Sequence, residues 1–454
     1  MAGIGWKLER MLEKGTLSST LQAYLTGVAV TSAPWLLTTA VLVTLRVLSR
    51  GQAAAEFAQI ELLITLAYAS TLVLSAPVHL VVSRYAADRL YERRLDQVAR
   101  PIRRALTFTL LGFLVVGVVI MKLAAPPLEL AVPVALLTAI IGAQWLLLGV
   151  GGGMSSPAGV IGAFAIGTVA SVLAAVGLEH TAGLGARGYL IGFTFGQAVA
   201  LFAMLVRVLR DLPAQESPAP PGALRGAFHE YRVLAASALL VHAAVWVDKV
   251  LTWLLGGPGA ARTLASASAL AWFAVIPAFA WIYIQVETSF YRMFRRYYGG
   301  IESGARLESL ETSARDVRAE TSHLVRGAVV IQLVVLVLGV LAAPRIVAEL
   351  GLAADATVAL RYSLVAAALQ LLTLLALLLL YYLDLRREAL VIAATQFAAI
   401  AIATVVVVLV GAPPALGAAL GSIAPAGLAL WTLRRVVTTL LPDTFQSQPY
   451  GELL

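Results

Sequence analysis

Two opposite charges stand side by side inside an apolar run of the sequence. Asp248 and Lys249 lie within Leu239–Leu255, LLVHAAVWVDKVLTWLL, a run long enough to cross a bilayer. An ionisable residue at membrane depth is costly and usually faces a polar cavity or a partner, so the two charges indicate a transport path. Because adjacent residues on a helix do not face one another, we expect each charge to find its partner on another helix or across a wet cavity.

Helical spacing adds a stripe of aromatic and basic side chains to this segment. His242, Trp246, Lys249 and Trp253 are spaced by four, three and four and would share one helix face. The two tryptophans could flank the Lys249 ammonium by cation-π contact. Lys249 lies about 10 Å from the outer end of the run at ~1.5 Å per residue. Snorkelling to the interface, or bracing the fold without touching substrate, is therefore the alternative to a role in the path.

A second polar site is predicted where the run VETSFYRMFRRYYGG leaves the membrane. Glu287 comes one helical turn before a cluster of basic and aromatic residues, and Tyr283 comes one turn before Glu287. The members of the cluster are Tyr291, Arg292, Arg295, Arg296, Tyr297 and Tyr298. The cluster is either an ordinary interfacial belt or a cytoplasmic collar. In the second case Glu287 meets substrate or pairs with a neighbouring arginine.

Composition places these charges in a polytopic membrane protein. The chain has 454 residues, of which 60% are hydrophobic and 13% charged, and a mean hydropathy of +0.87. One soluble core could not bury this much apolar surface. The net charge of +8 comes from basic residues beside apolar spans, which is expected of cytoplasmic loops and argues against nucleic-acid binding. With no cysteine, the chain has no disulfide, thiolate metal site or cysteine nucleophile.

Signatures of an enzyme are missing from the sequence. No GxxxxGK[ST] loop is present to hold ATP, and the five histidines form no metal-binding spacing. They are His79, His180, His229, His242 and His323. We therefore predict a protein that is not an enzyme and has neither cofactor nor metal. Energy for transport, if needed, would come from an ion gradient or from a partner that pushes the substrate.

The predicted fold is all-α, with about 12 transmembrane helices in two six-helix lobes. Apolar runs predict spans near 19–46, 58–83, 105–124, 128–150, 157–178, 186–209, 233–256, 265–290, 327–343, 357–383, 389–410 and 414–435. Lys and Arg gather in the loops on the side of the N-terminus, which places both termini in the cytoplasm.

A proline-rich linker, Pro213–Gly222, divides the chain into halves with matching loop rhythm. In each half a long arginine-rich loop joins the second span to the third, and a short cytoplasmic loop follows. This pattern favours two six-helix repeats with a site at their interface near mid-membrane. The predicted domains are an amphipathic cytoplasmic helix (1–18), an N-lobe (19–212), a cytoplasmic linker (213–232), a C-lobe (233–435) and a cytoplasmic tail (436–454).

Several short strings, in order along the chain, resemble one family. They are MAGIG at Met1–Gly5 followed by Trp6, SAPW at Ser32–Trp35, WVDK at Trp246–Lys249, ETSFY at Glu287–Tyr291 and FQSQP at Phe445–Pro449. The chain thus resembles the PelG family, the inner-membrane transporter of the bacterial Pel exopolysaccharide system. That family lies within the superfamily of multidrug, oligosaccharidyl-lipid and polysaccharide flippases. The family more often has Phe at Trp6 and Gly at Ala33, both conservative departures.

The resemblance implies a V-shaped pair of lobes that carries a galactosamine-rich biofilm polymer from cytoplasm to periplasm. It also implies a complex with a cytoplasmic glycosyltransferase and small membrane subunits, one of them a cyclic di-GMP receptor. Arg93, Arg94, Arg295 and Arg296, in basic loops, are the candidates for docking these partners. The alternative is that the arginines are simply anchors on the cytoplasmic side.

The leading hypothesis is a polysaccharide transporter with a central cleft lined by both lobes. Asp248 and Glu287 would favour a partly deacetylated, cationic chain by charge complementarity. Lys249 would pair with one of these acids or with another. Two rivals stay open: an ion-coupled exporter of drugs or lipid-linked oligosaccharides on the same fold, and a membrane scaffold that anchors the polysaccharide synthase.

Overall fold

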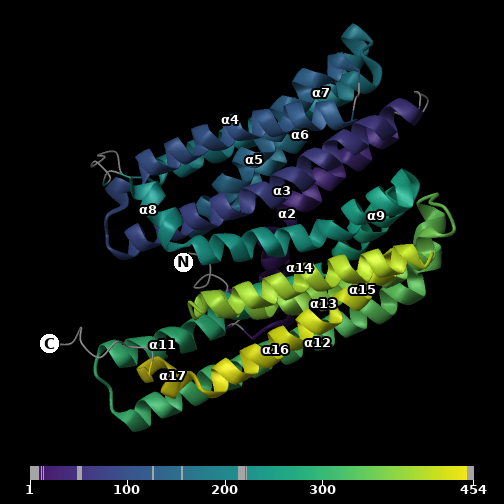
Figure 1. Cartoon of the computed structure of the whole chain (residues 1–454). Coiled ribbons are helices and arrows are strands. Elements are labelled where there is room, and N and C mark those ends of the chain that lie inside the picture. The colour runs from purple at the N-terminus through teal and green to yellow at the C-terminus, as the bar shows by residue number, and fades with distance from the viewer. Residues whose placement is uncertain are drawn as a thin grey trace. The chain divides into compact units, whose positions relative to one another are not determined.

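The structure is a computed structural model, described for residues 10–11, 13, 15–48, 54–124, 127–154, 157–212, 220 and 222–446. These residues form long helices and contain no strand (Figure 1). Ten helices among them are long and apolar enough to cross a membrane, or 11 if the two parts of the first are counted as one span. The predicted all-α polytopic class, with about 12 spans, is confirmed.

The helices follow one another with short connections. From Leu17 to Glu230 the described helices are α2 (Leu17–Leu48), α3 (Ala54–Tyr91), α4 (Ala99–Ala124), α5 (Ala131–Met154), α6 (Pro157–Ala182), α7 (Gly185–Arg210) and α8 (Ala223–Glu230). The next five are α9 (Arg232–Phe273), α10 (Ile276–Gln285), the π-helix η3 (Val286–Phe290), α11 (Tyr291–Glu302) and α12 (Leu307–Glu349). The last five are α13 (Ala356–Tyr382), α14 (Arg386–Leu409), α15 (Ala415–Gly421), α16 (Ile423–Thr438) and α17 (Leu440–Gln446). Short 3-10 turns, η1 (Leu95–Gln97) and η2 (Leu128–Leu130), precede α4 and α5.

Contacts divide the chain into two units. Unit 1 is built from Ser32–His242, and unit 2 from Ala243–Leu454 together with Ala2–Thr31. The division falls within helices α2 and α9. A contact unit is not the same as a membrane lobe, so the predicted domain limits stay predictions. Most of the predicted amphipathic helix at 1–18, and the tail beyond Gln446, lie outside the described residues.

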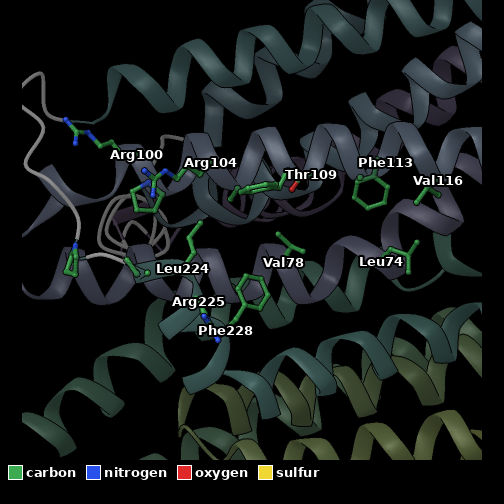
Figure 2. A pocket seen from close by; sticks show the side chains of 17 residues that line it. Leu74, Val78, Arg100, Arg104, Thr109, Phe113, Val116, Leu224, Arg225 and Phe228 are labelled. Atoms are coloured by element: carbon green, nitrogen blue, oxygen red, sulfur yellow. The ribbon is translucent and has the colours of Figure 1, made fainter.

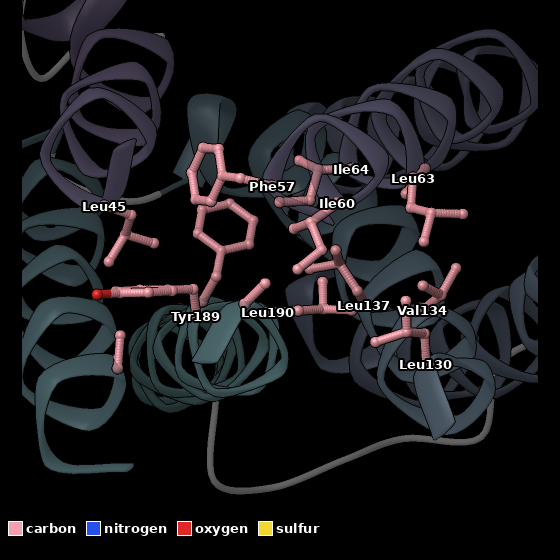
Figure 3. Packing of buried hydrophobic residues seen from close by; sticks show 14 of the residues in the cluster. Leu45, Phe57, Ile60, Leu63, Ile64, Leu130, Val134, Leu137, Tyr189 and Leu190 are labelled. Atoms are coloured by element: carbon pink, nitrogen blue, oxygen red, sulfur yellow. The ribbon is translucent and has the colours of Figure 1, made fainter. Parts of the chain in front are cut away.

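Unit 1 has an apolar core where α3, α5 and α7 meet. Phe57 and Ile60 of α3, Leu137 of α5 and Leu190 of α7 are all buried in one cluster (Figure 3). The ring of Phe57 meets that of Tyr189 edge to face at 6.2 Å. Helices that are apolar over most of their circumference bury one side against each other and leave the other for lipid.

Small residues bring α6 and α7 of unit 1 close together. Gly192 and Gly196 of α7 are four residues apart and face Ala175 and Ser171 of α6. A Cβ on Gly192 would lie 2.6 Å from the Cα of Ala175, so only glycine fits there. Such small-xxx-small contacts let helix backbones approach closely, which is how helices associate when lipid surrounds them.

Helix α9 is broken at Gly257, and the break separates the predicted seventh and eighth spans. Gly257 has a φ of 85°, a left-handed conformation that glycine adopts without strain, and Pro258 follows it. The predicted eighth span continues through the second part of α9 into α10 and the π-helix η3. The predicted seventh span and the beginning of the eighth therefore belong to one 42-residue element in the structure.

Candidate functional site

Asp248 and Lys249 pair with each other on the first part of α9. The Lys249 Nζ lies 3.1 Å from Oδ1 and 3.1 Å from Oδ2 of Asp248, and donates a hydrogen bond to Oδ2. The same Nζ donates to the carbonyl oxygen of Val245 at 2.8 Å. The expectation that these neighbours seek partners on other helices is wrong. The four-carbon lysine side chain is flexible enough to fold back along its own helix and reach the preceding carboxylate.

This ion pair is well shielded inside unit 2. The side chain of Asp248 is 3% exposed and that of Lys249 is 12% exposed. One helical turn before the pair, Ala244 packs with Ala366 of α13 and Ile400 of α14 in an apolar cluster. A charge in such surroundings needs a compensating partner, and each member of the pair supplies one for the other.

Unsatisfied polar atoms surround the ion pair along α9. Trp246 Nε1 and Thr252 Oγ1 are buried and have no hydrogen-bond partner in the part of the chain that the structure describes. Trp253 is 55% exposed, and neither tryptophan makes a cation-π contact with Lys249 among the described residues. The predicted aromatic clamp is therefore not formed, because the ammonium is held by Val245 and Asp248 instead.

His242, at the other end of the predicted stripe, meets a second histidine. Its ring lies 6.0 Å from that of His79 on α3, edge to face, and both residues belong to unit 1. His242 Nδ1 lies 2.8 Å from the carbonyl oxygen of Ala238. Across the described ranges, no group of three or more His, Cys, Asp or Glu side chains could hold a metal ion.

Glu287 lies on the π-helix η3, where the helix widens by one residue. Such π-turns occur mostly singly inside α-helices and frequently at functional sites. Tyr382, the last residue of α13, donates a hydrogen bond from its hydroxyl to Glu287 Oε1 at 3.4 Å. The side chain is partly buried, and both residues belong to unit 2. The structure thus holds an acid against an aromatic hydroxyl at this place.

Aromatic rings continue from Tyr382, the partner of this glutamate, along η3 and α11. The Tyr382 ring meets Phe290 edge to face at 5.8 Å and Phe294 at 6.1 Å. Phe294 lies 4.6 Å from Tyr298, whose ring lies 5.1 Å from that of Tyr297. We call Glu287 with Phe290, Phe294, Tyr298 and Tyr382 the acid-aromatic cluster. It combines a carboxylate with rings whose faces and edges can contact the apolar side of another ring.

Tyr283 stands one turn before Glu287 on α10 and packs next to the start of α2. Ala23 and Ile284 form a buried contact there, with Tyr24 and Tyr283 against it. Tyr24 stacks on Trp281 at 6.4 Å between ring centroids. This arrangement explains why residues before Ser32 belong to unit 2.

The four arginines predicted as docking candidates are all exposed. Arg93 has a φ of 59° in the turn that ends α3, and Arg94 donates its backbone N–H to the carbonyl of Arg89 at 2.8 Å. This is the left-handed C-cap usually filled by glycine. Arg296 of α11 lies 3.4 Å from Asp316 of α12, and both side chains are well exposed.

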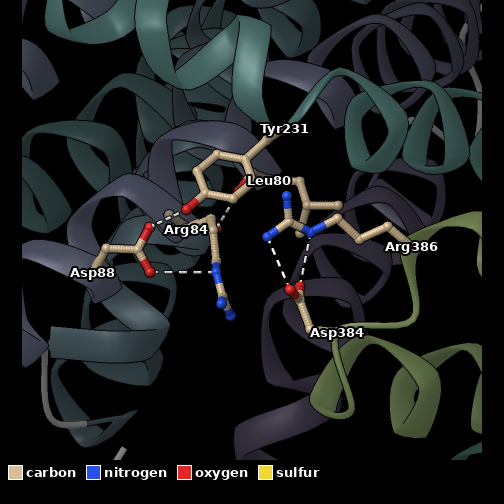
Figure 4. A network of polar contacts seen from close by, with 7 residues as sticks. Leu80, Arg84, Asp88, Tyr231, Asp384 and Arg386 are labelled. Atoms are coloured by element: carbon tan, nitrogen blue, oxygen red, sulfur yellow. Dashed lines mark hydrogen bonds and ion pairs between the residues drawn. The ribbon is translucent and has the colours of Figure 1, made fainter. Parts of the chain in front are cut away.

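Two polar clusters at helix ends were not predicted from the sequence. In unit 1, the Tyr231 hydroxyl donates to Asp88 Oδ2, and Arg84 Nε lies 3.3 Å from Asp88 Oδ1 (Figure 4). In unit 2, Arg386 holds both oxygens of Asp384 at 2.8 and 2.9 Å (Figure 4). Burial, and next the hydrogen bond to Asp88, raise the pKa of Tyr231 above its ordinary value. The phenol therefore stays protonated and keeps donating.

The sequence pattern missed Tyr382 and the π-turn. Tyr382 could have been suspected as a functional residue, because it stands at the end of an apolar span, just before the basic loop Asp384–Glu388. Its pairing with Glu287 could not, because the two residues are 95 positions apart and nothing in either segment fixes their register. A π-turn adds a single residue to a helix, and the apolar pattern around Glu287 runs through it without interruption.

The fold defined by these helices is that of a membrane transporter. An inward-facing multidrug resistance MATE family transporter of the MOP superfamily matches with a TM-score of 0.63 and 14% identity, covering 92% of this chain and 99% of the other. An outward-facing transporter of the same family matches with a TM-score of 0.64 and 15% sequence identity, covering 91% of this chain and 96% of the other. MATE in the straight conformation matches with a TM-score of 0.64 and 15% sequence identity, covering 92% of this chain and 96% of the other. At this identity the likeness concerns the fold. No curated protein sequence matches the chain.

The family is set by the sequence itself. Residues 1–445 match the family PelG, described as "Putative exopolysaccharide Exporter (EPS-E)", and the chain belongs to this family. The resemblance drawn from the short motifs is thereby confirmed. The protein is a multi-pass membrane protein of a transporter family, and neither family nor fold is of an enzymatic type.

Proposed function

We propose that this protein exports a galactosamine-rich exopolysaccharide of the Pel type across the bacterial inner membrane. Membership of an exopolysaccharide exporter family supports the substrate class, and the transporter fold supports movement across a bilayer. The distribution of Lys and Arg supports two cytoplasmic termini. The route predicted from the sequence, a central cleft lined by both lobes, remains a prediction.

The acid-aromatic cluster is the observation that carries this proposal. A hexosamine ring presents an apolar face, which suits rings such as those of Phe294 and Tyr382. A deacetylated unit also carries an ammonium, which is attracted both by the Glu287 carboxylate and by aromatic faces. Several weak contacts of this kind hold a polymer loosely enough that it can slide from one unit to the next.

Asp248 takes a different role in the proposal from the one expected from the sequence. Its charge is offset by Lys249 at 3.1 Å, so the pair exerts little net attraction on a cationic polymer. We assign the pair to bracing α9 within its buried surroundings, and Glu287 to meeting the substrate. Both assignments can be tested separately, because the two sites lie on different elements.

Partners belong to the proposal as well. A cytoplasmic glycosyltransferase and small membrane subunits, including a cyclic di-GMP receptor, would deliver the polymer. Exposed arginines at helix ends suit docking of an acidic surface, since rim charges mainly steer association. Arg93→Gly tests this cleanly, because glycine keeps the left-handed turn and removes only the side chain. We expect weaker capture of the glycosyltransferase together with an unchanged level of protein in the membrane.

The fold supports a second candidate, an ion-coupled exporter of drugs or lipid-linked oligosaccharides. The similar solved structures are described as multidrug resistance transporters. Purified protein in liposomes would then move such a solute without partners when a proton or sodium gradient is applied. The exopolysaccharide proposal expects no such transport. A scaffold that only anchors the synthase would tolerate changes in the acid-aromatic cluster and fail only when docking arginines are changed.

The proposal is tested by replacing Glu287 in cells that make the polymer. Glu287→Gln keeps the size of the side chain and removes its charge, and Glu287→Asp keeps the charge. Glu302→Gln, at the exposed end of α11, is the matched control. We expect secreted polymer to fall roughly tenfold in Glu287→Gln, with protein levels in the membrane unchanged, and to stay near normal in the control. Normal secretion from Glu287→Gln would overturn the proposed site.

A further inference from the structure

A groove of about 610 Å³ lies in unit 1 among α3, α4 and α8. One end is basic and is formed by Arg100 and Arg104 of α4 and Arg225 of α8. The rest is apolar and continues along α4 past Phe113 to Val116 (Figure 2). A groove that is basic at one end and apolar along the rest suits a molecule with an anionic head and an apolar tail.

The length of the groove matches a membrane lipid. Arg100 and Val116 are 16 residues apart on one helix, or about 24 Å at ~1.5 Å per residue. This exceeds half of a hydrocarbon core of roughly 30 Å, so the groove reaches from a leaflet's surface into its interior. Phe108, in the wall, is 72% exposed, which in a membrane span means that it faces lipid.

Polar details of the groove fit a phospholipid headgroup. Neither Arg104 nor Arg225 has an ion-pair partner in the part of the chain described here, so their guanidinium groups can bind a phosphate, which they recognise in bidentate fashion. Thr109, five residues after Arg104 on α4, also lines the groove; it is 6% exposed, and its hydroxyl has no hydrogen-bond partner within the described residues.

We propose that this groove binds one anionic phospholipid of the surrounding bilayer. Its phosphate lies between Arg104 and Arg225, and one acyl chain runs along Val78, Phe113 and Val116. Leu224 and Phe228 of α8 line the same groove, so the bound lipid holds α8 against α3 and α4. Because α8 belongs to the predicted linker 213–232, lipid composition sets how firmly this helix is attached to unit 1. This inference does not depend on which polymer the protein exports.

Gly112 gives a clean way to block the groove. It lines the apolar part, and a Cβ built there would meet nothing within 4 Å. Gly112→Leu therefore fills the place of the acyl chain without disturbing the backbone, and leucine is a better helix former than glycine. Gly162 of α6 has equally open space and lies outside the groove, so Gly162→Leu is its matched control. Arg210→Gln, at the exposed end of α7, is the control for charge removal.

The test measures thermal unfolding of the delipidated full-length protein in detergent. The added probes are phosphatidylglycerol, phosphatidylcholine and inorganic phosphate, each titrated separately. We expect saturable stabilisation by phosphatidylglycerol alone, because only that probe has both a phosphate with net negative charge and acyl chains. The half-saturating concentration should rise roughly fivefold for each of Arg104→Gln and Arg225→Gln. Gly112→Leu should abolish the saturable effect, and both controls should keep it.

Three results would overturn the lipid site. Equal stabilisation by phosphatidylcholine would show a groove without charge selectivity. Stabilisation by inorganic phosphate at similar concentrations would show an anion site that needs no acyl chain. An unchanged phosphatidylglycerol titration in Gly112→Leu would show that the lipid binds elsewhere.

Discussion

The Nζ of Lys249 lies 3.1 Å from the carboxylate of Asp248, its immediate neighbour on the same helix. Two residues that would each be costly alone inside the membrane thus form one compact, nearly neutral unit. The pair shields its charges without a second helix, although Trp246 Nε1 and Thr252 Oγ1 beside it remain unsatisfied within the described residues.

Removing only the lysine should therefore be more harmful than removing both charges. Lys249→Met leaves a buried carboxylate, and breaking such a pair destabilises by about 3 kcal/mol or more. We expect a lower midpoint in denaturant titration of purified Lys249→Met protein, together with reduced secretion.

The double variant Asp248→Asn with Lys249→Met separates bracing from substrate contact. Both charges are gone, so stability should return to within about 1 kcal/mol of the native protein. If the pair only braces α9, secretion returns as well. A stable double variant that secretes nothing would mean that the pair acts on the substrate directly.

Tyr382→Phe should weaken the acid-aromatic cluster without removing its rings. The change deletes the hydroxyl that donates to Glu287 at 3.4 Å and keeps the edge-to-face contacts with Phe290 and Phe294. A hydrogen bond of this length is weak, so we expect secretion to fall only about two- to fivefold. Tyr382→Ala should lower it much further because it removes a wall of the cluster. Equal secretion by the two variants would argue against a role for the ring.

Tyr231 gives a prediction for pH. Burial and Asp88 raise its pKa, so the folded chain holds the phenolic proton more tightly than the unfolded chain does. Its stabilising effect should be complete below about pH 10, the ordinary value for tyrosine, and should decline as the pH rises above it. Unfolding midpoints measured from pH 8 to 11 should show this decline.

Tyr231→Phe should lower stability near pH 8 by about 1.5 kcal/mol, because Asp88 loses a donor. The same variant should flatten the alkaline decline. If Tyr231→Phe loses stability with rising pH as steeply as the native protein, the pH dependence belongs to another titrating group.

The close contact of α6 with α7 predicts a contrast between two glycines. A methyl group at Gly196 would overlap Ser171, whereas one at Gly162 would meet open space. Gly196→Ala should destabilise the protein by about 1–3 kcal/mol through overpacking. Gly162→Ala should leave stability unchanged or raise it slightly. Similar unfolding midpoints for both variants would contradict the packing described for unit 1.

Much of the fold could be predicted because lipid imposes a simple rule on sequence. Each span must be apolar over about 20 residues, so runs such as that of α13 are visible without a structure. The break at Gly257 was also placed between two predicted spans, since Gly and Pro interrupt the pattern there. Contacts between helices leave weaker traces, because small residues occur at many positions. The glycines of α7 were not identified as a contact for this reason.

The candidate site was predicted only in part. The sequence identified the charges that are costly in the membrane, Asp248, Lys249 and Glu287, because an ionisable residue inside an apolar span is rare however the helices pack. Their partners were predicted only in part: Asp248 was one of the acids expected to pair with Lys249, whereas Tyr382 was not predicted as the partner of Glu287. Lys249 bends back along its own helix, which the rule for rigid neighbours on a helix does not anticipate. Tyr382 reaches Glu287 across the fold, and such a contact depends on packing that one sequence does not specify.

Photocrosslinking at position 294 tests the central proposal most directly. A photoreactive phenylalanine analogue replaces Phe294 of the acid-aromatic cluster in cells that make the polymer, and Leu338, 61% exposed on α12, carries it as the control. We expect a polymer adduct at position 294 that disappears when polymer synthesis is stopped, and none at position 338. Active secretion without any adduct at position 294, or equal adducts at both positions, would contradict it.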